Sequence, residues 1–372
     1  MIRVLHYVGR MDRGGMQALI MNLYRNIDRS EIQFDFAIHG TNNGDFEKEI
    51  VAMGGEFYQF PIMRSNPLAY RKKWREFWSE HANDYSAFHM HNNSLANIIA
   101  LEEAARANVP IRIIHSHSSF ANRGHLQILN NFLHRLHRNK LNIVATHCIT
   151  CSDRAAEWMY GGMKIGSKDV ILLKNGVDIN KYKFSEEIRK SKRDELKAEE
   201  GELIIGQVGS FLPVKNHEFS LKLAKELKNR GIAFKFIFFG DGPLLDSIIK
   251  KAEELEILDE TLFVGKRSDV AELLSAMDIY VMPSLYEGLP VSLVEAQVNG
   301  VTSIVSDSIT KTVAFNDNLH YKSIDTVDEW ADLICQGAYA HEANIKKIVE
   351  NGFDIMDTCR IYREIIMNEG IN

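Results

Sequence analysis

Cysteine is scarce in this sequence, and long apolar runs are missing from it. The 372 residues include four cysteines, Cys148, Cys151, Cys335 and Cys359. So few thiols do not form the dense framework of a disulfide-stabilised secreted protein, and we therefore expect a reducing, cytoplasmic environment. No run of about 18 apolar residues could span a bilayer, and the first residues lack the apolar core of a signal peptide. Any membrane contact is expected to be peripheral, at the inner face of the cell membrane.

Acidic residues are also missing from one long region. None occurs from 104 to 152, although the chain has 50 Asp and Glu in total. The region holds these basic residues: Arg106, Arg112, Arg123, Arg135, Arg138 and Lys140. Within it, Leu129, Phe132, Leu133 and Leu136 have helical spacing, which predicts a basic amphipathic helix suited to anionic lipid headgroups or a lipid-diphosphate acceptor. The alternative is an ordinary solvated helix face.

Two further features bear on partners. The segment "YRKKWREFW", residues 70–78, is a second and weaker candidate for a lipid-facing surface. The net charge of −6 excludes a strongly basic protein, and we expect no nucleic-acid partner.

Strand-length apolar runs alternate with amphipathic helices along the whole chain. This order predicts βαβ units and parallel sheets, and the pattern restarts near residue 203. We expect two doubly wound α/β domains, at 1–180 and 200–352, with a charged linker or exposed helix between them. The last helix, about 353–372, either caps the second domain or packs back on the first, and we favour the first domain.

The segment "SLYEGLPVSLVEAQVNG", from Ser284 to Gly300, carries the strongest functional signal. It follows a predicted strand, and Pro290 suits the first turn of the helix that comes next. Gly288 lets the backbone approach an anion at the positive end of that helix. Glu287 and Glu295 would flank this anion, and carboxylates accept hydrogen bonds from sugar hydroxyls. Two surface glutamates are the alternative.

Several motifs in one order resemble glycosyltransferase family 4. They are "PSLYEGLPVSLVEA", "LLKNGVDINKY", "VGSFLPVKNH", "FFGDGPLLDSI" and "LFVGKRSDVAELLSAMDIYVMPS". The resemblance implies the GT-B architecture, in which two Rossmann-like domains face a cleft. It also implies retaining transfer from a nucleotide-diphosphate sugar, with UDP the expected nucleotide and no metal or resident cofactor. The acceptor would be a glycan or lipid-linked oligosaccharide of surface polysaccharide biosynthesis.

The same resemblance assigns donor-site residues in the second domain. Glu287 would bind the donor sugar, Glu295 the ribose, and Lys215 the diphosphate. The remaining substrate-binding candidates of this domain are Ser210, Gly265, Lys266, Gly288, Leu289 and Pro290, and Asn175 is a further one near the end of the first domain. Gly265 and Lys266 would lie near the base. Ser210 stands where the family has an arginine, and the candidate replacements are Lys266, Arg267, Lys311 or an arginine of the first domain.

The first domain would contribute acceptor-side residues. Gly14 and Gly15 open the first helix, and either serve the donor diphosphate and acceptor or form a plain turn. The family places a histidine near the donor sugar, which corresponds to His117 or His115. We favour His117 as the catalytic-site residue.

Histidines and cysteines in this half invite a metal or redox hypothesis. His89 and His91, like His115 and His117, form H-x-H pairs, but no nearby Asp, Glu or Cys completes a site, so we expect no metal. "CITC" lies on an apparent strand, so we expect buried structural thiols.

Two other functions remain open from the sequence. One is a sugar-nucleotide epimerase of related fold. The other is a sugar-nucleotide-binding or scaffold protein of weak activity, because Ser210 replaces the expected arginine.

Overall fold

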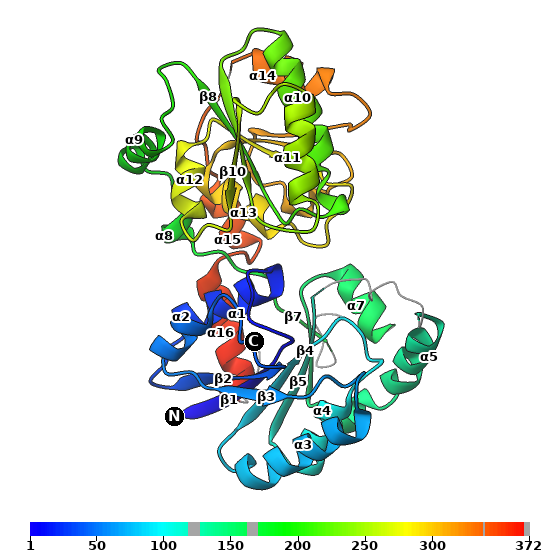
Figure 1. Cartoon of the computed structure of the whole chain (residues 1–372). Coiled ribbons are helices and arrows are strands. Elements are labelled where there is room, and N and C mark those ends of the chain that lie inside the picture. Colours follow the sequence, from blue (N-terminus) through cyan, green and yellow to red (C-terminus); the bar gives the residue numbers. More distant parts are fainter. Residues whose placement is uncertain (118–126, 162–169, 338, 368–372) are drawn as a thin grey trace. The chain divides into compact units, whose positions relative to one another are not determined.

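The structure is a computed structural model that describes residues 1–117, 127–161, 170–337 and 339–367 (Figure 1). The chain divides into two compact units. The first comprises Met1–Gly176 and Ile355–Asn372, and the second comprises Val177–Asp354. Each unit is a parallel sheet between helices, and each is described by itself.

The first unit has a seven-stranded parallel sheet in the order β3-β2-β1-β4-β5-β6-β7. Its strands are β1 (Ile2–Tyr7), β2 (Ile32–His39), β3 (Phe57–Phe60), β4 (Ala87–His91), β5 (Ile111–Ser116), β6 (His147–Thr150) and β7 (Ile171–Leu172). Its helices are α1 (Gly15–Asn26), α2 (Glu47–Ala52), α3 (Pro67–His81), α4 (Ile99–Arg106), α5 (Gln127–Arg138), α6 (Leu141–Val144), α7 (Asp153–Tyr160) and α16 (Ile355–Met367).

The second unit has a six-stranded parallel sheet in the order β10-β9-β8-β11-β12-β13. Its strands are β8 (Leu203–Val208), β9 (Phe234–Phe239), β10 (Thr261–Gly265), β11 (Ile279–Met282), β12 (Thr302–Ser306) and β13 (Leu319–Lys322). Its helices are α8 (Ile179–Tyr182), α9 (Glu186–Glu195), η1 (Pro213–Lys215), α10 (His217–Asn229), α11 (Leu245–Glu254), α12 (Val270–Ala276), α13 (Val291–Asn299), η2 (Lys311–Val313), α14 (Asp328–Cys335) and α15 (Ile345–Glu350).

Apolar side chains on both faces of each sheet explain these layers. In the first unit, one buried cluster joins α1 and α16 to the strands, and a second joins α3 and α4 to the opposite face. In the second unit, α12 and α13 cover one face, and α10 and α14 cover the other. Strands buried on both faces are typical of parallel sheets. The expected α/β class with two Rossmann-like parallel sheets is confirmed.

The last helix, α16, belongs to the first unit. Tyr362, Ile365 and Ile366 are buried there, and the Tyr362 ring meets the Phe34 ring edge-on at 5.7 Å. Arg363 Nε donates to Glu31 Oε2 at 2.7 Å on the rim of this contact. The C-terminal segment thus completes the core built by α1 and the first two strands.

The charged stretch expected to form a linker or exposed helix forms helix α9, which has no buried residue and belongs to the second unit. Arg189 and Arg193 of α9 both pair with Asp278, which is 10% exposed. Both guanidinium groups also donate to backbone carbonyls at the end of α12, including that of Ala276. These bonds attach a helix with no buried side chain of its own.

The aromatic side chains of segment 70–78 do not face solvent, whereas its charged residues Lys72, Lys73, Arg75 and Glu76 do. It lies in α3, where Tyr70, Trp74, Phe77 and Trp78 are all buried. The weaker lipid-surface hypothesis for this segment is therefore wrong, because its aromatic stripe packs into the core.

Candidate functional site

In the second unit, two loops meet at the topological switch point of the sheet. One loop follows β8 and the other follows β11, and ligands of doubly wound folds bind beyond the strand ends at such points. The loops are joined by two hydrogen bonds. Leu285 N donates to Val214 O at 2.8 Å, and Asn216 Nδ2 donates to Pro283 O at 3.2 Å.

Lys215 and Glu287 form an ion pair between these loops. Lys215 Nζ lies 2.6 Å from Glu287 Oε1, and the two side chains are 20% and 13% exposed. The Lys215 backbone is fixed by Gln207 Nε2, which donates to its carbonyl at 2.8 Å. Two residues predicted for diphosphate and sugar, 72 positions apart, thus contact each other directly.

Helix α13 starts beside Glu287. Pro290 occupies the N-cap position and the helix begins at Val291, with no acidic residue in its first turn. Gly288 is exposed, and a Cβ at this position would meet nothing within 4 Å. Leu289 is partly buried and its carbonyl accepts from Val291 N at 3.0 Å. The helix N-terminus therefore offers a positive dipole end without a competing carboxylate in that turn.

Glu295 lies one turn further into α13 and is partly buried. Burial raises the pKa of this carboxyl to about 7, and a hydrogen bond from Tyr182 and the charge of Lys181 oppose the rise. At neutral pH the group can therefore donate as an acid or accept as a carboxylate.

Ser210 is exposed in the loop after β8, beside close-packed backbone. A Cβ at Gly240 would lie 2.1 Å from the Gly209 carbonyl oxygen, so this position requires glycine. Phe211 N donates to Asp241 O at 3.0 Å, and Gly240 N donates to Gly265 O at 2.9 Å. Residues 209–211, 240–242 and 265 therefore form one continuous backbone surface.

Lys266 extends from this surface. Its Nζ lies 4.0 Å from Asp241 Oδ2, and its side chain is 40% exposed. Arg267 is committed elsewhere, because it pairs with Asp269 and Glu195. Lys311 Nζ lies 5.8 Å from the centroid of the Tyr321 ring. Of the cations considered in this unit as replacements for the arginine at Ser210, Lys266 has the best placement. An arginine from the first unit stays a prediction.

In the first unit, Gly14 is the N-cap of α1 and Gly15 is its first residue. Gly14 has φ −135°, an extended conformation open to any residue, and a Cβ at Gly15 would meet nothing within 4 Å. A Cβ at Gly14 would lie 2.7 Å from Gln17 Oε1, so the Gln17 side chain reaches the start of this helix. The role of these glycines at the donor diphosphate and acceptor stays a prediction.

Five histidines gather at the carboxyl ends of β1, β4 and β5. His6, His89, His91 and His115 are buried, and His117 is partly buried directly after β5. The His115 and His117 ring centroids are 4.0 Å apart, so the structure places both candidates in one cluster. Burial lowers the pKa of His117 to about 3, so its ring is neutral at neutral pH.

The cluster contains two overlapping histidine triads whose ring nitrogens lie within 4.8 Å of one another. They are His6, His89 and His91, and His91, His115 and His117. Such a donor set fits a transition metal chemically. However, short hydrogen bonds between rings already use several of these nitrogens, and within the described part of the chain no hydrogen bond joins these rings to a carboxylate. The expectation of no metal stays a prediction.

A pocket of about 600 Å³ lies beside this cluster. It is lined by His91, His39 and Tyr7, and by four asparagines, Asn92, Asn93, Asn97 and Asn130. Amide groups both donate and accept hydrogen bonds, which suits a polyhydroxyl ligand. The remaining candidate of this half, Asn175, is buried in the segment that follows β7, and its Oδ1 has no hydrogen-bond partner among the described residues.

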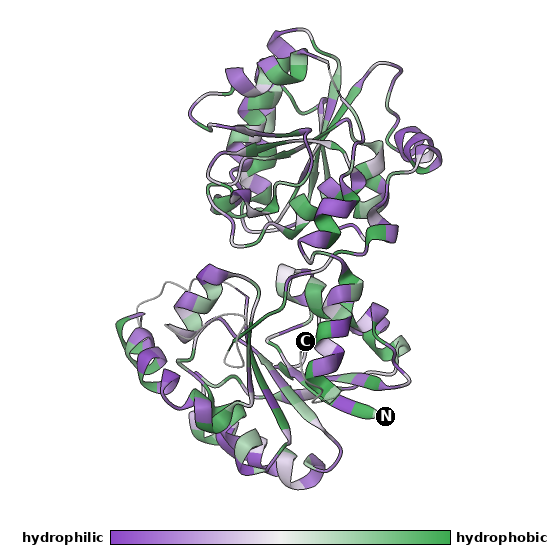
Figure 2. Ribbon diagram, turned by 180° about the vertical axis from the view of Figure 1, so that it is seen from behind, coloured by the Kyte–Doolittle hydropathy of each residue, from purple (hydrophilic) through white to green (hydrophobic). Residues whose placement is uncertain are grey.

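Helix α5 presents the expected apolar side chains to solvent. Ile128, Leu129, Phe132 and Leu136 are 50–87% exposed, and green residues recur among purple ones along this helix (Figure 2). Leu133 is partly buried. Some of the basic side chains in the surrounding region already have bonding partners within the protein. Arg112 donates to the backbone carbonyl of Val144, and Lys140 pairs with Glu102.

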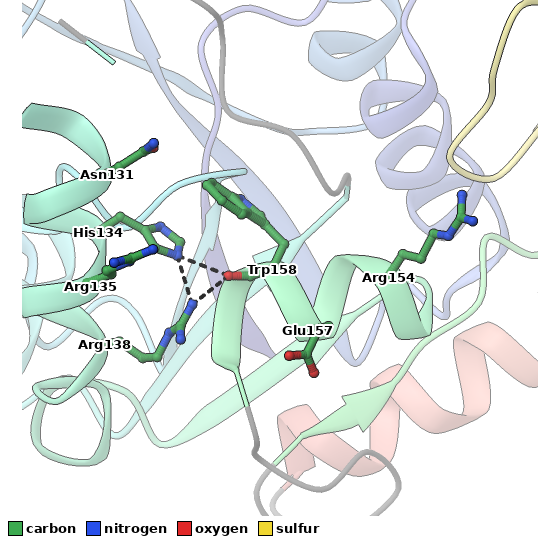
Figure 3. Close-up of a pocket in the computed structure, with 7 residues that line it drawn as sticks. All are labelled: Asn131, His134, Arg135, Arg138, Arg154, Glu157 and Trp158. Atoms are coloured by element: carbon green, nitrogen blue, oxygen red, sulfur yellow. Dashed lines mark hydrogen bonds between the residues drawn. The ribbon is translucent and has the colours of Figure 1, made fainter. Parts of the chain in front are cut away.

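A basic pocket of about 520 Å³ adjoins α5. Figure 3 shows His134, Arg135 and Arg138 from α5 and Arg154, Glu157 and Trp158 from α7 around it. Arg138 Nη2 donates to the Trp158 carbonyl at 2.8 Å, and His134 Nε2 lies 3.0 Å from the same oxygen. These two side chains thus bond a backbone carbonyl, and the lining also includes the cations of Arg135 and Arg154 and the carboxylate of Glu157.

Known families match both units in turn. The sequence model "Glycosyltransferase Family 4" matches residues 13–181, and "Glycosyl transferases group 1" matches residues 188–334. The chain is 38% identical to the EpsF protein of Bacillus subtilis over 351 residues, which cover 91% of this chain and 88% of EpsF. The chain belongs to glycosyltransferase family 4.

Other relatives of this glycosyltransferase are more distant. The capsular polysaccharide biosynthesis glycosyltransferase CapH of Staphylococcus aureus is 24% identical over 376 residues, 99% of each chain. The UDP-Gal:alpha-D-GlcNAc-diphosphoundecaprenol alpha-1,3-galactosyltransferase of Escherichia coli is 27% identical over 232 residues, covering 60% of this chain and 58% of its own. The HepE structure from Anabaena, in complex with UDP, matches with a TM-score of 0.76 and 17% identity over 99% of this chain and 100% of its own. The GT-B fold predicted for this glycosyltransferase is thereby confirmed.

Sequence reasoning missed His6 and the asparagine-lined pocket of this glycosyltransferase. His6 has no H-x-H partner, and only the strand order places it opposite His89. Within the described ranges, no helix is both long enough and apolar enough to cross a bilayer.

Proposed function

We propose that this glycosyltransferase moves a sugar from a UDP-sugar to a lipid-diphosphate-linked glycan in surface polysaccharide biosynthesis, with retention of the anomeric configuration. The observation that carries the proposal is the Lys215–Glu287 pair at the N-terminus of α13. It combines a cation for phosphate, a carboxylate for sugar hydroxyls and a helix dipole at one switch point.

The departing diphosphate is the main charge to be stabilised. Lys215, the start of α13 and the backbone of Gly288–Pro290 would bind it without a metal ion, and Glu295 would bind the ribose hydroxyls. Glu287 would hold the donor sugar. His117 would act on the acceptor or sugar side from the first unit. No residue is assigned as a general base, because the leaving phosphate can take the proton.

Lys266 would supply the positive charge that the family's arginine provides at the position of Ser210. Its position beside the 240–242 loop supports this role. Removing one charged hydrogen bond costs about 1.5–3 kcal/mol, so Lys266→Gln should weaken UDP binding by about 10- to 150-fold. Adding Ser210→Arg should restore most of the loss, whereas Ser210→Arg alone should add little. UDP affinity is measured by calorimetry. If Ser210→Arg changes it equally in the wild type and in Lys266→Gln, Lys266 does not bind the diphosphate.

The first unit would bind the acceptor. The asparagine-lined pocket suits the glycan, and the exposed apolar residues of α5 with the basic pocket beside them suit a lipid diphosphate at an anionic membrane surface. Two relatives support this choice. CapH is named for capsular polysaccharide biosynthesis, and the Escherichia coli relative acts on a diphosphoundecaprenol-linked sugar.

Donor turnover tests the function. The protein is incubated with UDP-, GDP- and ADP-sugars, with and without lipid-diphosphate-linked sugars, and nucleotide release and product anomers are followed. Release of UDP only with acceptor, giving an α-linked product from an α-linked donor, supports the proposal. Epimerised donor without transfer indicates an epimerase. UDP binding without turnover for any pair of substrates indicates a binding protein.

A further inference from the structure

The five clustered histidines form a branched hydrogen-bond network that starts at the Tyr362 hydroxyl. One branch runs from Tyr362 to His6 Nε2 at 3.4 Å, from His6 Nδ1 to His91 Nε2 at 2.9 Å, and from His91 Nδ1 to His117 Nε2 at 2.8 Å. The other branch runs from Tyr362 to His89 Nδ1 at 3.1 Å, and from His89 Nε2 to His115 Nδ1 at 3.3 Å.

Each branch ends at a ring nitrogen without a partner. His117 Nδ1 and His115 Nε2 are buried atoms with no hydrogen-bond partner among the described residues. A buried polar atom left unpaired costs about 1–3 kcal/mol. Both atoms therefore favour a ligand that completes their hydrogen bonds.

All five rings are neutral at neutral pH. Burial lowers the pKa of His6 and of His117 to about 3, and it lowers the pKa values of His89, His91 and His115 well below the usual range. A neutral imidazole has one N–H donor and one acceptor nitrogen. Each ring in the network therefore transmits the direction of its hydrogen bond to the next.

The single proton of Tyr362 links the two branches. If the hydroxyl donates to His6, then His6, His91 and His117 must all carry their protons on Nδ1. The hydroxyl oxygen then accepts from His89 Nδ1, and His89 accepts from His115 Nδ1. If the hydroxyl donates to His89 instead, every proton moves to Nε2. A fully bonded network therefore has all five rings in the same tautomer.

The two open ends follow from this rule. With every proton on Nδ1, His117 Nδ1 is a donor and His115 Nε2 is an acceptor. With every proton on Nε2, the two roles are exchanged. In both states the network presents one donor and one acceptor.

We propose that His117 Nδ1 and His115 Nε2 are a coupled donor–acceptor pair for hydroxyl groups of a ligand, and that Tyr362 is the positioning residue that couples them. A hydroxyl group both donates and accepts, so a polyol or sugar satisfies this pair in either state. Phosphate and carboxylate oxygens only accept, so they satisfy one end. The coupling stands independently of the proposed function, whereas the identification of the ligand as a sugar rests on it.

A metal ion is the competing occupant. It would need a nitrogen of His91, and both are already bonded, Nδ1 to His117 Nε2 at 2.8 Å and Nε2 to His6 Nδ1 at 2.9 Å. Metal binding would therefore break one of these two bonds. The tautomer network keeps both of these bonds, so we favour it.

Ring-nitrogen NMR of the full-length protein labelled with 15N-histidine tests the coupling. We expect His6, His89, His91, His115 and His117 to report one shared tautomer in the wild type. In Tyr362→Phe the branches lose their link, and at least one ring should change its tautomer or become a mixture. Different Nδ1 and Nε2 proton populations among the five rings of the wild type, or an unchanged pattern in Tyr362→Phe, would overturn the proposal.

Tyr160→Phe is the matched control for loss of a buried hydroxyl. The Tyr160 hydroxyl lies 2.9 Å from the Ile114 carbonyl oxygen and 2.7 Å from that of Ile149, and its one proton is shared between them. Among the described residues it has no hydrogen bond to a ring of the network. The control variant should leave all five tautomers unchanged even if it lowers stability. Titration with Zn²⁺ separates the competing occupant. Stoichiometric Zn²⁺ binding that shifts the ring signals at micromolar metal would overturn the hydroxyl assignment.

Kinetics then test the ligand class. In a protein with transferase activity, Tyr362→Phe should lower kcat/KM at least about fivefold relative to Tyr160→Phe. Equal values for the two variants would refute a role of the network in substrate binding. An inactive wild type that still shows the shared tautomer would refute the proposed function but leave the coupling intact.

Discussion

Glu287→Gln should strengthen the binding of UDP while it lowers sugar transfer. In the structure Glu287 Oε1 lies 2.6 Å from Lys215 Nζ, so a diphosphate that takes this ammonium group must first displace a carboxylate. Glutamine keeps the size and one acceptor oxygen of the side chain but removes the charge. UDP lacks the donor sugar that Glu287 would bind, so its affinity reports only the released Lys215.

The magnitude follows from the burial of the pair. Fully exposed ion pairs contribute about 0.2–1 kcal/mol, and hydrogen bonds to charged groups contribute about 1.5–3 kcal/mol. Side chains that are 20% and 13% exposed fall between these cases, at about 1–2 kcal/mol. UDP should therefore bind the variant about 5- to 30-fold more tightly. The transfer rate should fall at least about tenfold, because the sugar loses a charged hydrogen bond.

Isothermal titration calorimetry with UDP measures this effect, and Glu202→Gln is its control. Glu202 Oε2 lies 2.7 Å from Lys235 Nζ, and these side chains are 14% and 23% exposed, close to the Lys215 pair. Both variants change the net charge equally. A gain in UDP affinity in Glu202→Gln would assign the effect to net charge. Unchanged or weaker UDP binding in Glu287→Gln would refute the competition between carboxylate and phosphate.

Three further predictions concern the pH dependence, the attachment of α9 and the membrane surface. Burial raises the pKa of Glu295 from 4.5 to about 7, so between these pH values the native state binds a proton that the unfolded state has lost. The free energy of unfolding, measured by urea titration relative to Glu295→Gln, should therefore fall as the pH rises from 4.5 to about 7 and level off above that. Asp278→Asn should cost about 3–5 kcal/mol of unfolding free energy, because Arg189 and Arg193 lose their shared carboxylate, whereas exposed Asp194→Asn on α9 should cost little. Phe132→Asp should weaken binding to phosphatidylglycerol vesicles about tenfold or more in flotation assays, and Leu68→Asp, at an 83% exposed position of α3, should not. Equal loss with both Asp variants would contradict a lipid role for α5.

The class of fold was predictable because burial on both faces leaves a strong signal. The run "FKFIFF" forms β9, and all but one of its residues are buried. Strand order was not predictable in this way, since β1 pairs with β4 through a crossover that composition does not encode. The role of α9 was also hidden. Its arginines bind Asp278, which lies 85–89 positions away, so local charge alone suggested a linker or an exposed helix.

The motif residues of the donor site could be proposed from sequence, but their partners could not. Helical spacing of Tyr70, Trp74 and Trp78 reveals an apolar stripe and does not say whether protein or lipid covers it. The same spacing on α5 belongs to exposed residues. Tertiary packing decides between these outcomes, and it depends on segments distant in the chain.

The histidine cluster also depends on tertiary contacts that the sequence does not reveal. Alternation along a strand predicts that His89 and His91 share a face, as His115 and His117 do. Only the register His6–His89 and His91–His115 brings the three strands' rings together, and only α16 supplies Tyr362. The chemistry of His117 then depends on a hydroxyl 245 positions away, because in a bonded network of neutral rings a tautomer belongs to the whole cluster. A site residue identified by motif therefore acquires its donor or acceptor character from residues that carry no motif.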